Sequence, residues 1–328
     1  MRAPARIDLG GGWTDVPPYC NELGGFVCNI AINRYAVATV RAAETYRASG
    51  ALAASAASAA SAASAVSAAT GESANSPLVA AAVRRSGLTD VNVDVISDFP
   101  LGSGLGGSSA ASAAAIGALR TWKGEPLDLA DIAEQGRRIE VEDLGISGGR
   151  QDHYAATHGG ALALTFTDRV EVRRLRVSDQ TRAAFEARAL LVYTGESRIS
   201  GSTVKAVLDA YRTGDGHVLS ALAGMKSLAR LMADALEKGD LDWLDELLAE
   251  HWGFQRSLHP AIPTPRIDEI VMRAHGAGAI GWKAMGASGG GCILVLTRTE
   301  THDAVQRAIA PLGELLPFGL DTDGLVRQ

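Results

Sequence analysis

The 328-residue sequence lacks the features that mark several classes of protein. Its three cysteines, Cys20, Cys28 and Cys292, are an odd number without metal-site spacing, so we expect free thiols in a reducing cytoplasm. No apolar run is long enough to cross a bilayer, and residues 1–4 lead into no signal-peptide core. The net charge of −6 argues against a nucleic-acid partner held by bulk electrostatics. We therefore expect a cytoplasmic protein with no membrane and no nucleic-acid partner.

The composition otherwise suits a folded chain, with one exception. Hydrophobic residues make up 47% and charged residues 21%, which is enough for a normal core in one large domain or two medium ones. The exception is residues 51–72, which repeat Ala-Ala-Ser over most of their length. A three-residue repeat gives no stable apolar stripe on a helix of about 3.6 residues per turn. We expect a low-complexity insert there, either a solvent-facing helix or a disordered segment.

Apolar spacing predicts the remaining elements. Alternation favours strands at residues 24–32, 35–41, 91–96, 161–166, 170–176, 189–193 and 293–297. Helical spacing favours helices at residues 78–85, 110–119, 129–141, 200–256 with a break at 214–216, 266–275 and 301–310.

The most informative stretch is residues 98–109, where a strand leads into four glycines and two serines that open a helix. Glycines let a loop turn tightly and bring backbone N–H groups to one point. The helix N-terminus adds unpaired donors and the positive end of its dipole. The stretch therefore predicts a phosphate cradle. The plainer alternative is a glycine-rich turn with a serine N-cap.

Two common cradles fit this loop poorly. Gly102, Gly104 and Gly107 match the dinucleotide fingerprint, but Asp-Phe-Pro separates them from the strand. The acids about 20 positions further on lie in a polar turn, not at a strand end. A P-loop needs Gly-Lys-Ser/Thr, and this loop has no lysine.

The pattern Pro-x-Gly-Ser-Gly-Leu-Gly-x-Ser-Ser-Ala resembles the ATP loop of the GHMP kinases, the superfamily of galactokinase, homoserine kinase, mevalonate kinase and phosphomevalonate kinase. Many members lack the extra glycine at 107, whereas the sugar-1-kinase branch of fucokinases and heptose-phosphate kinases commonly carries a residue there. The resemblance implies ATP bound by Gly102, Ser103, Gly104, Leu105, Gly106, Gly107, Ser108 and Ser109.

A second stretch near the start, Pro-Ala-Arg-Ile-Asp-Leu-Gly-Gly-Gly-Trp-Thr-Asp, reads as a strand end and a glycine turn. By itself it exposes an aromatic ring and a carboxylate that suit a polyol, or it is a plain β-turn. It is similar to the substrate motif of heptose-phosphate kinases and fucokinases. That similarity implies substrate contacts from Trp13, Thr14 and Asp15, and Arg6 beside the catalytic aspartate. Galactokinase has Glu-His where this chain has Gly-Trp, which argues against galactose.

A third stretch, Gly-Gly-Arg-Gln-Asp-His-Tyr-Ala-Ala, contains Asp152. Phosphoryl transfer needs a group that takes or orients the hydroxyl proton, and an aspartate on a rigid turn suits that role. A helix-capping aspartate is the alternative. The stretch resembles Gly-Gly-Lys-Gln-Asp-Gln-Tyr-Ala-Ala of heptose-phosphate kinases. The resemblance implies that Asp152 is the base, aided by Arg6.

The same branch implies a magnesium site. Glu140 matches its metal-binding glutamate, with Ser108 or Ser109 as the partner, although spacing does not separate Glu140 from Glu142. No Gly-x-Ser-x-Gly nucleophile accompanies His153, so we expect it in local packing or in contact with substrate.

Two C-terminal stretches complete the resemblance. Arg198 follows Thr-Gly-Glu-Ser and suits bidentate phosphate contact, or the segment simply caps a helix. Lys283 matches a lysine of the heptose-kinase branch and is expected to neutralise a substrate phosphate, with a solvated lysine as the alternative. The triple glycine at residues 289–291 resembles the third family motif, which packs against the phosphate loop.

Together the motifs predict an α+β, two-part GHMP kinase fold. Residues 1–185 form a half like ribosomal protein S5 domain 2, with the insert at 51–72, and residues 186–328 form a ferredoxin-like half. The expected reaction transfers the γ-phosphoryl group of ATP, with Mg²⁺, to a sugar or sugar phosphate. The anomeric hydroxyl of D-glycero-D-manno-heptose 7-phosphate is the leading acceptor.

Three alternatives remain. The chain is L-fucose kinase or another monosaccharide 1-kinase, a non-catalytic sugar sensor on the same fold, or, more distantly, a nicotinamide dehydrogenase. The oligomeric state, a homodimer included, stays open.

Overall fold

The computed structural model describes residues 1–43, 70–72, 76–196 and 201–328. Within them, two antiparallel sheets organise the chain. The first has six strands in the order β3-β4-β2-β5-β6, with β1 also paired to β2, and the second has four in the order β10-β7-β9-β8. The strands of the first sheet are β1 (Arg2–Gly10), β2 (Gly25–Ala42), β3 (Thr70–Glu72), β4 (Val91–Ser97), β5 (Ala161–Phe166) and β6 (Val170–Arg174). Those of the second are β7 (Ala189–Tyr193), β8 (Ala279–Ala284), β9 (Cys292–Thr297) and β10 (Glu314–Leu315).

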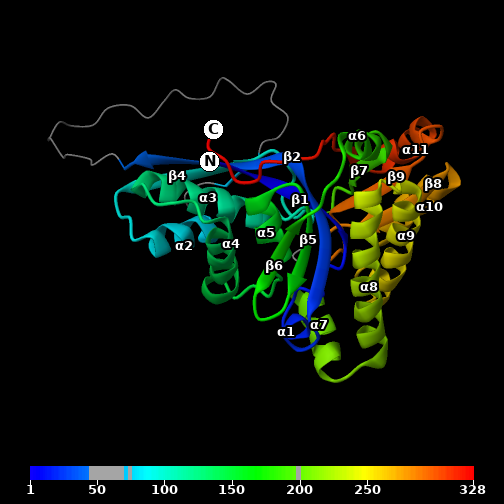
Figure 1. Ribbon diagram of the computed structural model, residues 1–328, viewed down its shortest axis with the longest axis horizontal. Coiled ribbons are helices and arrows are strands. Elements are labelled where there is room, and N and C mark those ends of the chain that lie inside the picture. The colour runs from blue at the N-terminus through cyan, green and yellow to red at the C-terminus, as the bar shows by residue number, and fades with distance from the viewer. Residues whose placement is uncertain (44–69, 73–75, 197–200) are drawn as a thin grey trace, which may run out of the picture.

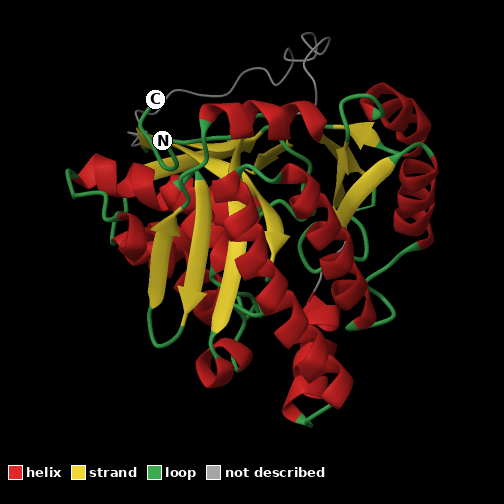
Figure 2. Cartoon of the chain, turned by 45° about the vertical axis from the view of Figure 1, so that its right-hand side comes forward, coloured by secondary structure: helices red, strands yellow, loops and turns green. Residues whose placement is uncertain are grey.

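Helices surround both sheets. In Figure 1, α2 to α4 lie beside the first sheet at the left, and α8 to α11 lie near the second sheet at the right. Figure 2 shows the strands as a broad group and a smaller one, with helices between and around them. The α-helices are α1 (Tyr19–Leu23), α2 (Pro77–Ser86), α3 (Gly107–Lys123), α4 (Leu129–Arg138), α5 (Gln151–His158), α6 (Asp179–Arg188), α7 (Gly201–Arg212), α8 (Gly216–Lys238), α9 (Leu241–Ser257), α10 (Pro265–Gly276) and α11 (His302–Ile309). A π-helical turn, η1 (Ile139–Asp143), extends α4, and a 3-10 turn, η2 (Ala310–Leu312), follows α11.

Strand β2 is longer than the sequence predicts. Alternation gave two strands separated at Asn33 and Arg34, but β2 runs through both residues. The C-terminal segment satisfies their polar side chains. Asn33 Oδ1 accepts the N–H of Gly319 at 2.7 Å, and Arg34 Nε donates to the carbonyl of Pro317 at 2.8 Å. A polar pair that looks like a turn therefore remains in a strand because a distant segment forms hydrogen bonds with both side chains.

The helical stretch at residues 200–256 contains one more break than predicted. Besides the predicted break near residues 214–216, α8 ends at Gly239, whose φ of 73° is left-handed. Asp240 then caps α9, because its Oδ1 accepts the N–H of Trp243 at 3.1 Å. This Gly-Asp pair carries a helix-stop signal and a helix-start signal that the apolar spacing hides.

Helix α3 lies in the largest hydrophobic core. Its small side chains at residues 109–119 are all buried, and the helix packs against β2. A Cβ on Gly117 would lie 2.9 Å from Leu325, so the C-terminal segment also lies against this helix. Arg2 and Val326 form a bridge beside it. Small residues thus bring α3, and the glycine loop before it, close to the first sheet.

The expected half boundary at residue 185 falls within α6, between the two sheets. Leu320 forms a bridge with Ile32, so the end of the expected C-terminal half returns to the first sheet. The last three residues of the expected insert form β3, which pairs with β4. The expected helix or disordered segment is therefore wrong for these three residues. The rest of the insert, residues 51–69, lies outside the described residues.

Candidate active site

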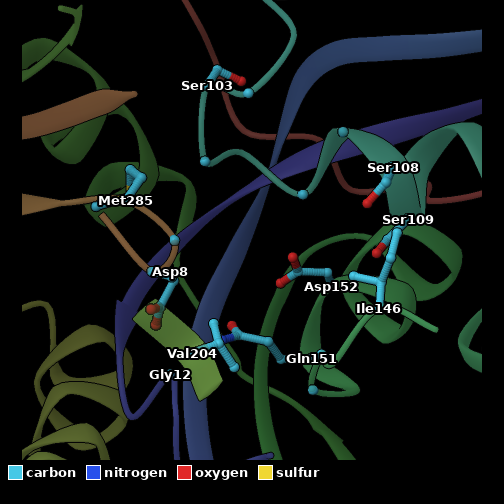
Figure 3. A pocket seen from close by; sticks show the side chains of 18 of the residues that line it. Asp8, Gly12, Ser103, Ser108, Ser109, Ile146, Gln151, Asp152, Val204 and Met285 are labelled. Atoms are coloured by element: carbon cyan, nitrogen blue, oxygen red, sulfur yellow. The ribbon is translucent and has the colours of Figure 1, made fainter. Parts of the chain in front are cut away.

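A cavity of about 710 Å³ is lined by the end of β1, the glycine loop before α3, the start of α5 and the loop between β8 and β9. This volume is within the range of roughly 300–1,000 Å³ typical of small-molecule sites. Figure 3 shows side chains from these elements around a common space. The charged lining residues include Arg6, Asp8, Asp15, Glu140 and Asp152.

The glycine loop has the conformation that only glycine adopts easily. Gly102, Gly104 and Gly106 have φ values of 69°, 77° and 74°. A Cβ on Gly104 would also lie 2.6 Å from the backbone oxygen of Met285. Helix α3 begins at Gly107, and no side chain caps its first turn. The serine N-cap alternative is therefore wrong, and the first turn borders the cavity with its N–H groups uncapped.

The loop is held from both sides. The N–H of Cys292 donates to the carbonyl of Ser103 at 2.7 Å, and a Cβ on Gly291 would lie 2.7 Å from the same oxygen. The expected packing of the triple glycine against the loop is thus confirmed. On the other side, Arg6 N–H donates to the carbonyl of Leu105 at 2.9 Å. The Leu105 side chain is fully buried in the hydrophobic core and, unlike the rest of the expected loop, does not line the cavity.

Arg6 and Asp152 form an ion pair at the edge of this loop. Arg6 Nε and Nη2 each lie 2.8 Å from Asp152 Oδ1, and Arg6 Nη1 donates to the carbonyl of Gly104 at 2.5 Å. The arginine side chain is 4% exposed, whereas that of Asp152 is 29% exposed. One carboxylate oxygen is therefore fixed by the arginine, and the other has no hydrogen bond to a described residue.

Ser108 and Glu140 meet beside the start of α3. Ser108 Oγ donates to Glu140 Oε1 at 3.0 Å, and both residues line the cavity. Burial raises the pKa of Glu140, but the hydrogen bond and charge of His153, then the Ser108 hydrogen bond, outweigh it and lower the pKa. Glu142 instead pairs with Arg85 at 2.8 Å on the outside. Of the two glutamates, Glu140 is the one that reaches the cavity, because residues two apart on a helical turn point to different sides.

His153 supports Glu140 and does not line the cavity. Its Nε2 lies 3.1 Å from Glu140 Oε2 and 3.4 Å from Ser109 Oγ. A hydrolytic triad uses the two ring nitrogens for different partners, whereas here one nitrogen makes both contacts. Of the two roles left open by the sequence, the structure therefore places His153 in local packing. No spacing could have revealed this contact, because it joins α5 to η1.

Asp15 accepts hydrogen bonds from the backbone at the start of α5. Its Oδ2 accepts the backbone N–H groups of Arg150 at 2.8 Å and Gln151 at 3.0 Å. Burial raises the pKa of Asp15 to about 6, against the lowering effect of these two hydrogen bonds. Trp13, two residues earlier, has a left-handed φ of 79° and also lines the cavity.

Two expected substrate contacts, Thr14 and Lys283, lie outside the cavity. Thr14 is fully buried, and its hydroxyl donates to the carbonyls of Gly11 at 2.7 Å and Phe26 at 3.1 Å, so it stabilises the turn. Lys283 is fully buried and does not line the cavity, because its ammonium donates a hydrogen bond to the carboxylate of Asp8. Lys283 is therefore not a solvated lysine, and its ammonium is directed at Asp8 and not into the cavity. Arg198 lies outside the described residues.

Two segments of the chain match models of one protein family. Residues 76–160 match the model described as GHMP kinases N terminal domain, and residues 232–315 match GHMP kinases C terminal. Together the two segments make up more than half of the chain. The chain belongs to the GHMP kinase family. The expected α+β, two-part GHMP fold is confirmed, and so is a phosphotransferase with an alcohol group as acceptor.

Three relatives show how far the likeness to GHMP kinases extends. D-glycero-alpha-D-manno-heptose 7-phosphate kinase of Campylobacter jejuni is 28% identical over 332 residues, covering 99% of this chain and 97% of that protein. The crystal structure of a D-glycero-D-manno-heptose 1-phosphate kinase from Bacteroides thetaiotaomicron superposes with a TM-score of 0.74 at 26% identity, covering 100% of this chain and 99% of that one. The bifunctional fucokinase/GDP-fucose pyrophosphorylase of Arabidopsis thaliana is 28% identical over 91% of this chain, which spans 30% of that longer protein.

GHMP kinases use ATP as phosphate donor, and the glycine loop has the form that such a donor requires. A Cβ at Gly104 would collide with the Met285 backbone and displace the loop, and the uncapped start of α3 attracts anions. Ser108 and Glu140 supply oxygen atoms, and Mg²⁺ prefers one or two carboxylates together with substrate phosphates. The residues present therefore fit both groups. Within the described residues, no helix is long and apolar enough to cross a membrane.

Proposed function

We propose that this GHMP kinase transfers the γ-phosphoryl group of ATP to the anomeric hydroxyl of a sugar, with D-glycero-D-manno-heptose 7-phosphate as the leading acceptor. The observation that carries the proposal is the Arg6–Asp152 ion pair beside the glycine loop, in one cavity with Asp15 and Trp13. The likeness to the heptose 7-phosphate kinase of Campylobacter jejuni over nearly the full length supports the choice of acceptor.

Asp152 is proposed as the group that takes or orients the proton of the acceptor hydroxyl. Arg6 binds Asp152 Oδ1 and the Gly104 carbonyl together, so it fixes the carboxylate relative to the loop. The remaining oxygen, Oδ2, is then available to the acceptor. A positioned general base of this kind contributes roughly 10²–10⁴-fold in rate.

The backbone of residues 102–109 is proposed to bind the triphosphate, with Ser108 and Glu140 at the metal position. When bound, ATP supplies the phosphoryl group and Mg²⁺ offsets the negative charge of the phosphates. Glu140 has a lowered pKa, so it remains an anionic oxygen donor at neutral pH. The ammonium of Lys205, which also lines the cavity, pairs with Asp209 at 2.6 Å.

On the acceptor side, Trp13 and Asp15 are proposed to contact the sugar. Both line the cavity, and aromatic rings stack on sugar faces while carboxylates accept from hydroxyls. Arg198 is retained as a proposed phosphate contact on the strength of the sequence. The buried Lys283 is not part of this proposal.

A second candidate acceptor is L-fucose. The chain is 28% identical to the Arabidopsis fucokinase and 27% identical to L-fucokinase/L-fucose-1-P guanylyltransferase of Bacteroides fragilis. Burial of Lys283 removes one expected contact to a substrate phosphate, which favours an unphosphorylated sugar.

ADP release with ATP and Mg²⁺ against a panel of sugars tests the proposal. The panel contains D-glycero-D-manno-heptose 7-phosphate, the unphosphorylated heptose, L-fucose, D-mannose and D-galactose. We expect turnover of the heptose phosphate by wild type and loss of that turnover in Asp152→Asn. NMR of the product should show a phosphate on the anomeric oxygen. Turnover of L-fucose alone selects the second candidate. Sugar binding without ADP release contradicts the kinase proposal and leaves a sensor.

A further inference from the structure

Three buried polar atoms without partners border the same cavity. They are Asp8 Oδ1, Trp13 Nε1 and Gln151 Oε1, and none has a hydrogen bond to a described residue. Buried polar groups in native proteins nearly always have a partner. Orphaned atoms gathered around one cavity therefore indicate a polar ligand that completes them. Neither Asp8 nor Gln151 was singled out by the sequence motifs as a substrate residue.

Asp8 is a charged acceptor held from behind. Lys283 Nζ donates to Asp8 Oδ2 and to the Asp8 carbonyl, both at 2.9 Å, and both residues are buried. Burial is the largest single influence and raises the pKa of Asp8, but the charges of Lys283, His251 and Arg6, with the Lys283 hydrogen bond, together outweigh it and lower the pKa. The carboxylate thus stays ionised, with Oδ2 occupied and Oδ1 unpaired.

Gly12 lets the Asp8 and Gln151 side chains approach each other at the cavity wall. A Cβ on Gly12 would lie 2.3 Å from Asp8 Oδ2 and 2.8 Å from Gln151 Nε2, so any larger residue would displace one of these side chains. Figure 3 shows Asp8 and Gln151 on either side of this region, with Asp152 close by. Gln151 directly precedes Asp152 on α5, and its backbone N–H is fixed by Asp15.

We propose that Asp8 and Gln151, at the wall of the cavity, bind hydroxyl groups of the acceptor sugar other than the one phosphorylated. This inference rests on the proposed function and names the contacts that select its substrate. A carboxylate with one free oxygen calls for a hydrogen-bond donor, and a sugar hydroxyl supplies one. A site built to bind a hydroxyl rejects an analogue that lacks it far more strongly than a hydrophobic pocket rejects a lost methylene. Lys283 acts here as a positioning residue for Asp8.

The test measures binding separately from turnover. Calorimetric titrations use D-glycero-D-manno-heptose 7-phosphate, D-mannose and L-fucose, then the monodeoxy forms of the tightest ligand. We compare wild type with Asp8→Asn and Gln151→Ala, and measure ATP binding and ADP release in parallel. Each variant is expected to weaken sugar binding about 10- to 100-fold while ATP binding stays unchanged. One monodeoxy sugar, which lacks the hydroxyl bound by Asp8, should bind poorly to wild type. Its affinity should not fall further in Asp8→Asn.

Asp245→Asn is the matched control. Asp245 is a buried carboxylate paired with Arg188 at 2.5 Å and lies outside the cavity, so Asp245→Asn disturbs a buried ion pair away from the sugar, although Arg188 keeps Asp242 as a second partner. Sugar binding should be normal in this variant. Equal weakening in Asp245→Asn and Asp8→Asn would overturn the inference. Thermal unfolding checks whether Asp8→Asn folds. If it does not, the inference is tested by two other results: weakened sugar binding in Gln151→Ala, and at least about 100-fold weaker binding of one monodeoxy sugar to wild type.

The remaining outcomes separate the two proposals. Weakened sugar binding in the variants without ADP release in wild type supports the contacts and contradicts the kinase reaction. Turnover with unchanged sugar binding in both variants supports the reaction and overturns the contacts. Absence of binding for every sugar contradicts both.

Discussion

Helices α3 and α5 both begin at the wall of the cavity, and their first turns differ in what they contact. At α5, Asp15 Oδ2 accepts the N–H groups of Arg150 and Gln151. At α3, no side chain caps the first turn after Gly106. A helix start that already contacts a carboxylate repels a second anion, whereas an uncapped one attracts it. The comparison supports the proposal that the phosphates bind at α3 and the neutral hydroxyls at α5.

The largest expected effect is at the start of α5. Asp152→Asn should lower kcat by about 10²–10⁴-fold, because the amide no longer takes the hydroxyl proton. The KM for ATP should change little, since the loop before α3 is untouched. Steady-state ADP release measures both constants. Asp94→Asn is the control, because Asp94 pairs with Arg41 in a surface ion pair at 2.7 Å, away from the cavity. A lowered affinity for ATP in Asp152→Asn would break the division between the two helices.

At the start of α3 the comparison is tested by two neighbouring glutamates. Glu140→Gln should raise the Mg²⁺ concentration needed for half-maximal rate by about 10- to 100-fold, because a ligand oxygen and its charge are lost. Glu142→Gln removes only an exposed pair with Arg85 and should change stability by less than about 1 kcal/mol and Mg²⁺ dependence not at all. Magnesium titrations of the rate compare the two. Equal effects would contradict the assignment of Glu140 as the metal-binding glutamate.

The loop itself is expected to tolerate no side chain. Gly104→Ala combines a φ of 77° with a Cβ 2.6 Å from the Met285 backbone oxygen, so the loop must move. We expect at least a roughly tenfold rise in the KM for ATP and unchanged sugar binding. Gly214→Ala has a similar φ of 76° with nothing within 4 Å of its Cβ, and it serves as the control for backbone strain. An unaltered KM in Gly104→Ala contradicts the cradle.

The smallest expected effect is a pH dependence at the start of α5. The pKa of Asp15 is raised to about 6, mainly by burial. As pH falls below about 6, Asp15 becomes protonated and sugar binding should weaken several-fold. The native state holds this proton more tightly than the unfolded state, so between about pH 4 and 6 this group's contribution to stability falls as pH rises.

Asp15→Asn should bind sugar weakly at every pH. Its stability should vary less with pH across the same window than that of wild type. Sugar titrations and denaturant unfolding at several pH values measure the two effects. An identical pH profile in wild type and Asp15→Asn would rule out this carboxylate as the titrating group.

The sequence predicted local elements and motifs better than contacts between them. Strands β5 and β7 have the predicted bounds, because alternation and flanking turns mark both ends. The continuity of β2 was missed, since it depends on the returning segment that binds Asn33 and Arg34. The short helix α1 and strand β8 were also not predicted.

Within the site, the sequence located the glycine loop and the Arg6–Asp152 pair from motifs. It did not reveal that Lys283 binds Asp8, because one residue lies on β8 and the other on β1. It likewise gave no sign that His153 orients Glu140, a contact between α5 and η1. Which charged groups neutralise each other is a property of the folded chain, and the residue spacing does not contain it.

The Lys283–Asp8 bond also has a mechanical consequence. It joins β8 of one sheet to β1 of the other in a fully buried position, and the bond from Cys292 N–H to the Ser103 carbonyl joins the two parts again nearby. Separating such a pair leaves each charge buried without a partner, which is strongly unfavourable. A hinge at this seam is therefore strongly disfavoured, and ligands should enter by movement of the surrounding loops. Amide hydrogen exchange in β1 and β8 should accordingly be equally slow, at the rate set by global unfolding.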